Sequence, residues 1–458
     1  MSSPQASGWR FELRALWILA LPLVFVQLGN QLKGVVDTAV VGRLGATELA
    51  AVGLANIVYY SFLVIGQGTV LGVDPHMSQA MGAGDPRRAR TMMWQGVWIA
   101  AVGTLLVVSL IATAPLIFAA FSVPADVADQ ATIYIWIRAI DVLPALLFVS
   151  LRCYLQAHSR TGMLLGAMFV TNVINLFGTL LLVFGGADLP SWCGPLQAVP
   201  AMGVAGSAIA TVLSTGAQLG MVVVAVRGLA VPEWTTGLRR AVWSEIRRAI
   251  EVGMPVGLQM LAEVGVFALA GLLAGNIGAV PLAAHQVALT LASVTFTMCI
   301  GLANATSVRV GKNIGAGDGR GARLAGLTGF GSALGLMTLP MALFIMAPEF
   351  VAGLLTDDPD VIAATVGLLG VAAIFQLTDG LQAVGAGTLR GAGDTRFSSI
   401  ANVAGHYLVG LPVAILCAFT FEMGVIGLWW GLAAGLSAVA FALVARFVSI
   451  SARPLRAL

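Results

Sequence analysis

Charged residues are scarce in this chain. Only 10% of its 458 residues are Asp, Glu, Lys or Arg, whereas 58% are hydrophobic and the mean hydropathy is +0.93. So few charges cannot cover the surface of a water-soluble globule, so the composition excludes a soluble fold and indicates lipid as the solvent. The net charge of +3 is spread over many short segments, which argues against nucleic acid as a partner.

Ligand and nucleotide motifs are also absent from the sequence. Cys153, Cys193, Cys299 and Cys417 have no CxxC or other metal-ligand spacing, so neither a disulfide framework nor a metal site is expected. The Gly-rich GAGD loops do not match the spacing of a phosphate-binding loop, and no nucleophile or acid and base pair stands out. We therefore expect no cofactor and no enzymatic activity.

The chain does have a series of apolar stretches of about twenty residues, which is the length that a helix needs to cross a bilayer. Twelve can be counted, and they predict an all-α integral membrane protein. They lie near residues 15–40, 53–75, 92–117, 131–155, 162–185, 203–226, 250–273, 283–308, 324–346, 362–387, 398–419 and 424–447.

The sequence contains an internal repeat. The GAGD segment at 82–85 returns at 315–318, an offset of 315 − 82 = 233, and the same offset pairs Pro22 with Pro255. Two repeats of six spans in the same orientation are typical of transporters whose path lies between the repeats. The predicted parts are an N-terminal six-helix lobe, a cytoplasmic linker and a C-terminal six-helix lobe, at 1–228, 229–248 and 249–458.

Basic residues orient the spans. Lys and Arg are concentrated in every second loop, which places these loops on one side of the membrane. Arg43 is the single cation in the loops of the opposite side. Because basic loops next to short spans stay in the cytoplasm, both termini are expected there. No cleavage motif follows the first apolar stretch, so no cleavable signal peptide is expected. We expect a multi-pass protein of the cell inner membrane, acting as a monomer.

Five segments are similar to the multidrug and toxic compound extrusion (MATE) family. They are LALPLVFVQLGNQLKGVVDTAVVGRLG, SQAMGAGD, GVAGSAIAT, GMPVGLQMLAE and FQLTDGLQAVGAGTLRGAGDT. The resemblance covers nearly the whole chain in order and spacing. It implies a V-shaped bundle of two six-helix lobes that exports cationic or amphipathic compounds in exchange for inward H⁺ or Na⁺.

Two other functions remain as alternatives. A flippase for lipid-linked sugars shares this fold, but it would be expected to place cations in its central cavity for a pyrophosphate, whereas these spans hold chiefly carboxylates. An integral membrane enzyme would need a nucleophile, a metal cluster or an acid and base pair at an interface, and none is visible.

Four carboxylates lie in otherwise apolar spans: Asp37, Asp141, Glu263 and Asp379. A charge at bilayer depth costs about 2.5 to 3.5 kcal/mol on insertion scales, so it marks an ion or substrate path by default. Arg138 lies three residues before Asp141, and a buried intrahelical salt bridge is the simplest interpretation of that pair. Asp141 therefore remains only a possible path residue.

The resemblance assigns Asp37 to the ion-coupling site of the first lobe. Lys33 lies one helical turn earlier, at a position that is usually uncharged in the family, so a Lys33–Asp37 pair that neutralises itself is an alternative. Four polar residues either complete this site or hydrogen-bond between helices. They are Asn172, Asn175, Thr179 and Thr211.

Glu263 and Asp379 have no carboxylate at the equivalent positions of the first repeat, which are Asn30 and Ala145. This asymmetry predicts a role peculiar to the second lobe. The two residues resemble the cation site of the NorM-type branch of the family, which makes both of them candidate ion-coupling residues. An aromatic hydroxyl often found four residues before this Asp is replaced by Phe375, which removes one ligand from the candidate path.

Three further polar residues receive structural interpretations. Asp74 precedes Pro75 at the cytoplasmic end of its span, where we expect a turn or a helix end. His285 and His406 are lone imidazoles in apolar spans. Either could carry a proton, but a packing role is favoured for both.

The orientation of the chain is testable by cysteine labelling. We expect a membrane-impermeant reagent added to intact cells to label Cys193. In a Cys193→Ser background it should label an Asp358→Cys variant but not an Arg240→Cys variant, because positions 193 and 358 fall in outward loops and position 240 does not. Labelling of Arg240→Cys from outside would overturn this topology.

Overall fold

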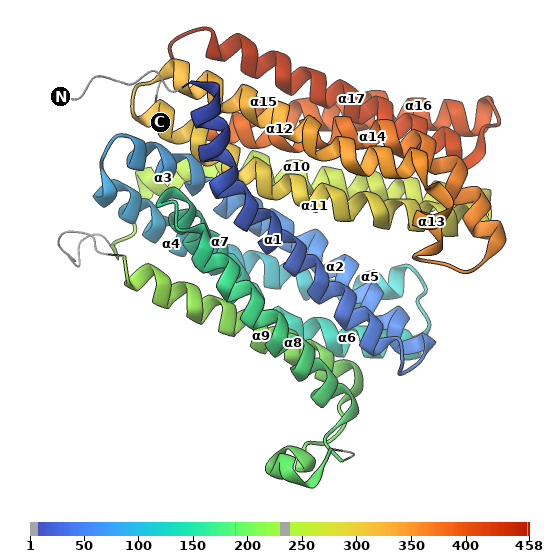
Figure 1. Ribbon diagram of the computed structural model, residues 1–458. Coiled ribbons are helices and arrows are strands. Elements are labelled where there is room, and N and C mark those ends of the chain that lie inside the picture. Colours follow the sequence, from blue (N-terminus) through green and yellow to red (C-terminus); the bar gives the residue numbers. More distant parts are fainter. Residues whose placement is uncertain (1–7, 188, 230–238, 456) are drawn as a thin grey trace. The chain divides into compact units, whose positions relative to one another are not determined.

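The computed structural model describes residues 8–187, 189–229, 239–455 and 457–458, and these residues form helices without a β-strand (Figure 1). Eleven helical segments are long and apolar enough to cross a membrane. A bent pair, Ala125–Ala139 with Val142–Ala157, brings the number to twelve, with an angle of 44° at the break. The predicted fold class and number of spans are therefore confirmed.

The α-helices follow one another in chain order. They are α1 (Trp9–Val41), α2 (Ala46–Val70), α3 (Val73–Gly82), α4 (Pro86–Ile111), α5 (Ala114–Ala120), α6 (Ala125–Ala139), α7 (Val142–Ala157), α8 (Thr161–Phe184), α9 (Gly203–Arg227), α10 (Trp243–Ile277), α11 (Ala279–Gly315), α12 (Gly319–Met346), α13 (Pro348–Gly353), α14 (Pro359–Gly391), α15 (Thr395–Val403), α16 (Leu411–Ile415) and α17 (Gly424–Ser451). A 3₁₀ helix, η1 (Ser191–Ala198), precedes α9, and two π-helical segments, η3 (Ala404–Gly410) and η4 (Leu416–Thr420), flank α16.

The chain folds into two compact units. As far as the chain is described, unit 1 comprises Met1–Gln27, Asp74–Asp85 and Leu258–Leu458, and unit 2 comprises Leu28–Val73 and Pro86–Gly257. These units differ from the halves of the repeat, because the start of α1 and α3 from Asp74 onward group with the second half. Residues 230–238 of the predicted linker lie outside the described residues.

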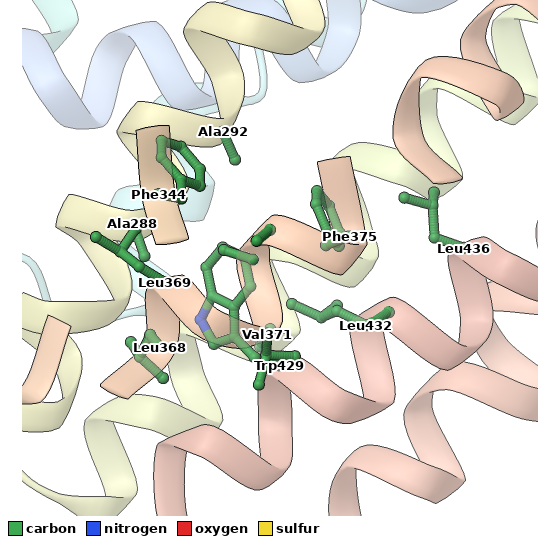
Figure 2. Close-up of a cluster of buried hydrophobic side chains, with 14 of the residues drawn as sticks. Ala288, Ala292, Phe344, Leu368, Leu369, Val371, Phe375, Trp429, Leu432 and Leu436 are labelled. Carbon is green, nitrogen blue, oxygen red and sulfur yellow. The ribbon is translucent and has the colours of Figure 1, made fainter. Parts of the chain in front are cut away.

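Unit 2 is built around α2, α4 and α6 to α9, with α8 against α9 and α4 against α7. In unit 1, α14 packs against α11, α12 and α17. Figure 2 shows the apolar core of unit 1, in which Trp429 of α17 lies among side chains of α14 that include Leu368 and Phe375. Both units therefore provide rigid helices from which polar side chains can project inward.

Three turns have the same sequence, GAGD, and follow the helices α3, α11 and α14. They lie at 82–85, 315–318 and 391–394. In each turn the second glycine has a left-handed backbone, with φ of +75° at Gly84, +73° at Gly317 and +82° at Gly393. Glycine adopts this conformation without steric cost, which explains why the motif is used as a turn.

The repeat also places two helices in close contact within unit 1. A Cβ atom at Gly82 of α3 would lie 2.0 Å from the Lys312 carbonyl oxygen, and one at Gly315 of α11 would lie 1.9 Å from the Gln79 carbonyl oxygen. The two contacts are related by the repeat, since 82 + 233 = 315 and 79 + 233 = 312. Only glycine permits this approach, and the crossing joins α3 to the second half of the chain.

This crossing yields a stability prediction. A Gly315→Ala substitution should lower the free energy of unfolding by about 1 to 3 kcal/mol, because the added methyl group overlaps a backbone that cannot rotate away. Gly331→Ala in α12 is the matched control, since a Cβ there meets nothing within 4 Å. The measurement is the thermal unfolding midpoint in detergent. Equal unfolding midpoints for the two variants would contradict the close contact between α3 and α11.

Candidate functional site

Asp37 lies in α1 at the centre of a polar cluster in unit 2. Its side chain is 5% exposed. Thr179 Oγ1 donates to Oδ1 at 3.0 Å, Asn175 Nδ2 donates to the same oxygen at 3.4 Å, and Thr211 Oγ1 donates to Oδ2 at 2.8 Å. Three neutral groups from α8 and α9 thus satisfy the carboxylate. This arrangement can exchange one hydroxyl contact for an ion while the others hold the carboxylate in place.

The structure brings together three of the four polar residues predicted for this cluster. Asn175 and Thr179 are four residues apart on α8 and face Asp37 together. Asn172 does not join them, because its Nδ2 donates to the Met168 carbonyl oxygen of its own helix at 2.9 Å. Asn172 therefore lies outside the cluster, although it shares a helix with Asn175 and Thr179.

Lys33 is buried one turn before Asp37 but does not form a salt bridge with it in the described part of the chain. Its Nζ donates to Gln218 Oε1 of α9 at 3.4 Å. The alternative in which Lys33 and Asp37 neutralise each other through direct contact is therefore not what the structure shows. Asp37 is left to its hydroxyl and amide donors.

Asp141 has different surroundings from Asp37. Arg138 Nη1 lies 2.7 Å from Asp141 Oδ2, and the pair sits at the bend between α6 and α7. Tyr59 covers the pair, with its hydroxyl donating to Asp141 Oδ2 at 3.3 Å and its ring 4.4 Å from the Arg138 guanidinium. The predicted salt bridge is present, but it joins α6 to α7 across the bend instead of lying within one helix. Both contacts are made to Oδ2.

Glu263 of α10 is the centre of a second polar cluster, in unit 1. Its Oε1 accepts hydrogen bonds from Gln259 Nε2 at 3.1 Å and Gln382 Nε2 at 2.5 Å, and also from Asn402 Nδ2. Ser398 Oγ donates to Gln259 Oε1 at 2.9 Å and orients that amide. Three neutral amides from α10, α14 and α15 therefore hold Glu263 without supplying any charge.

Asp379 is 5% exposed and has no hydrogen-bond or salt-bridge partner among the described residues. It shares a face of α14 with Gln382, three residues later, which binds Glu263. Phe375, one turn earlier, is an apolar neighbour whose ring packs 5.5 Å from that of Trp429 (Figure 2). Unit 1 thus holds two carboxylates at bilayer depth, and neither has a basic partner in the described structure.

Asp74 lies in the first turn of α3, the helix end that Pro75 predicts, and its side chain is buried in an ion pair that the sequence did not predict. Arg390 Nε lies 3.2 Å from Asp74 Oδ2, and Ser307 Oγ donates to the same oxygen at 2.7 Å. Because its partners come from α11 and α14, more than 200 residues away, the local sequence gave no sign of this pair.

The residues of the Glu263 cluster were only partly predictable. Gln259, Gln382, Asn402 and Ser398 were not predicted. Two of them carried a usable signal, because Gln259 precedes Glu263 by four residues and Gln382 follows Asp379 by three, which places each on the face of its carboxylate. The contribution of α15 depends on packing that the sequence does not display.

The fold and the two clusters define a class of protein. An all-helical multi-pass membrane protein with an internal repeat, and with polar clusters around carboxylates at bilayer depth in both units, has the architecture of a membrane transporter.

Comparison with known proteins identifies the family. The MatE family model matches residues 22–181 and 255–416, and the starts of the two ranges differ by 255 − 22 = 233, the offset of the repeat. A probable multidrug resistance protein NorM of Agrobacterium fabrum is 34% identical, covering 99% of this chain and 97% of that protein. One of Deinococcus radiodurans is also 34% identical, covering 95% of each. The chain belongs to the MatE family.

Solved structures share the fold. A multidrug resistance MATE family transporter in an outward-facing conformation aligns with a TM-score of 0.86 at 18% identity, covering 96% of each chain. The eukaryotic MATE transporter AtDTX14 aligns with a TM-score of 0.82 at 21% identity, again covering 96% of each. The resemblance predicted from the sequence motifs is confirmed.

The Asp37 cluster yields a transport prediction. Asp37→Asn keeps the shape of the side chain and most of its hydrogen bonds but removes its charge. We expect transport driven by an ion gradient to fall by about fivefold to a hundredfold, the usual range of a coupling free energy, with normal membrane abundance. Efflux from proteoliposomes is the measurement. Restoration of efflux when Lys33→Met is added to Asp37→Asn would show that the pair is structural and would refute an ion-coupling role.

Proposed function

We propose that this protein is a secondary active multidrug efflux antiporter, which exports cationic or amphipathic compounds in exchange for inward H⁺ or Na⁺. Asp37, Glu263 and Asp379 are its ion-coupling residues. The names of the relatives support export of drugs. The observation that carries the proposal is the pair Glu263 and Asp379, two carboxylates at bilayer depth without a basic partner in the described structure.

The two carboxylates without a basic partner among the described residues explain how an ion could drive transport. Two carboxylates that share a poorly hydrated site repel each other when both are ionised, so a proton or a cation lowers their free energy. An occupant that binds one conformation of the transporter more tightly than the other shifts the equilibrium between them. A drug that favours the opposite conformation is then coupled to the ion, and the coupling is reciprocal.

Other features support the substrate class and the setting. An anionic site favours cationic compounds, and apolar residues such as Phe267 and Phe375 beside it favour amphipathic ones. Three interior arginines form salt bridges with carboxylates and so are not positioned for the pyrophosphate that a flippase of this fold would carry. They are Arg138, Arg309 and Arg390. We place the protein in the inner membrane, with both termini cytoplasmic and with the monomer as the working unit.

The proposal is tested by efflux of a fluorescent cation such as ethidium from proteoliposomes under a fixed gradient of H⁺ or of Na⁺. Glu263→Gln, Asp379→Asn and the double variant should all fall to a similar low level, because removing either carboxylate destroys the shared site. Asp357→Asn, which removes an exposed carboxylate of an outward loop, is the matched control and should transport at the wild-type rate.

Two results decide the matter. Near wild-type coupled efflux in both single variants would refute the Glu263 and Asp379 site and move the coupling to Asp37. Absence of wild-type transport under either gradient would refute the antiporter itself.

A further inference from the structure

One face of α10 carries a row of side chains that begins at Glu263. Glu263, Phe267 and Gly271 follow at intervals of four residues and so lie along that face. The ring of His406 lies 6.4 Å from the ring of Phe267. Nε2 of His285 lies 3.9 Å from the position of a Cβ atom on Gly271. Two imidazoles thus stand one turn and two turns beyond Glu263, toward the α10–α11 loop.

Both imidazoles are buried and have no hydrogen-bond partner in the described structure. His285 is 0% exposed and His406 is 1% exposed, and none of their four ring nitrogens is paired. Nε1 of Trp429, whose ring is 6.0 Å from that of His285, is also unpaired. A buried polar group without a hydrogen-bond partner destabilises the folded protein. The indole only donates and does not carry a proton, whereas two unpaired imidazoles beside a row that leads to a carboxylate suit a partner that comes and goes, as a proton does.

The backbone at His406 is unusual as well. Residues Ala404–Gly410 form a π-helical segment, η3. Such wide turns within membrane or soluble helices are rare and are frequently found at functional sites. Tyr407 Oη donates to the Ala262 carbonyl oxygen at 3.0 Å, which ties η3 to α10 next to Glu263. The π-helical turn and the hydrogen bond together hold His406 on the face of α10 that carries Glu263.

We propose that His285 and His406 form a proton path along this face of α10, from the end of unit 1 near the α10–α11 loop to Glu263 and its neighbour Asp379. This inference rests on the proposed antiporter function and deepens it by naming H⁺ as the coupling ion. A neutral imidazole accepts a proton on one ring nitrogen and releases one from the other. The ring is neutral before and after each transfer, so the step needs no further reactant.

The surroundings of the two rings favour the movement of a cation toward Glu263. Among the described residues, the mid-span titratable groups of the helices packed against the two rings are Glu263 of α10, Cys299 of α11, Asp379 of α14 and Tyr407 of η3, whereas the other charged residues of these helices lie toward their ends. The side chain that α17 presents to His285 is the indole of Trp429, which does not titrate. The path therefore ends at two carboxylates, and no lysine or arginine is hydrogen-bonded to either imidazole.

The test compares His285→Leu and His406→Leu with the wild type in proteoliposomes. Efflux of ethidium driven by a pH gradient should fall by about tenfold or more, the usual scale for loss of a proton-transfer group. Its dependence on the pH of the compartment facing the α10–α11 loop should flatten, and ethidium binding measured by fluorescence should stay unchanged. Trp429→Phe is the control, because it removes an unpaired donor from the same core without removing a titrating group.

Four results would overturn the path. If both leucine variants keep wild-type efflux and pH dependence, with raised thermal stability, the imidazoles are packing groups and the proposed function stands. If only a Na⁺ gradient drives the wild type, the path fails and the antiporter again stands. If Trp429→Phe loses efflux as fully as the histidine variants, the effect is one of packing. Should the leucine variants fail to fold, His406→Gln replaces them, and wild-type efflux in it refutes the path.

Discussion

The compensation of charge inside an apolar medium is the constraint on which the rest of this structure depends. A charge at bilayer depth has no water to solvate it, so the protein must supply a partner. Arg390 supplies one for Asp74, Arg309 supplies one for Glu12, and a similar pair fixes the bend of α6 and α7. These pairs are fixed parts of the fold. The carboxylates left without such partners are the ones free to take one from solution.

The side chain of Glu263 is held in place by hydrogen bonds, although no positively charged side chain in the described part of the chain neutralises it. Its three amide donors fix the position of the carboxylate, and Ser398 fixes one of those amides. Neutral donors satisfy the geometry of the oxygen without cancelling its charge. An arginine in place of Gln382 would give a stronger bond but would close the site permanently, as at Asp74. The choice of amides therefore suits an exchangeable occupant.

Much of this could be predicted from the sequence, and the reasons for success and failure are physical. Spans follow from hydropathy, and Asn175, Thr179 and Thr211 follow from the period of the helix and the family motifs. The helix-end position of Asp74 follows from Pro75, but its ion pair does not, because the partners come from α11 and α14. Asn402 and Ser398 beside Glu263 were missed for the same reason, whereas Gln259 and Gln382 lie on the helix faces of Glu263 and Asp379. Contacts between helices distant in the sequence are set by packing, which a local pattern does not display.

The two copies of the internal repeat differ in sequence where they contact each other. Asp74 and Ser307 are equivalent positions, since 74 + 233 = 307, and they hydrogen-bond to each other at 2.7 Å. Residues related by a two-fold axis contact each other only where they lie beside that axis. Identical carboxylates at such a position would repel at close range, and identical serines would leave the nearby Arg390 without a counter-charge. The duplicated sequence must therefore differ at its own axis. It differs as well at Glu263 and Asp379, whose equivalent positions in the first repeat hold Asn30 and Ala145.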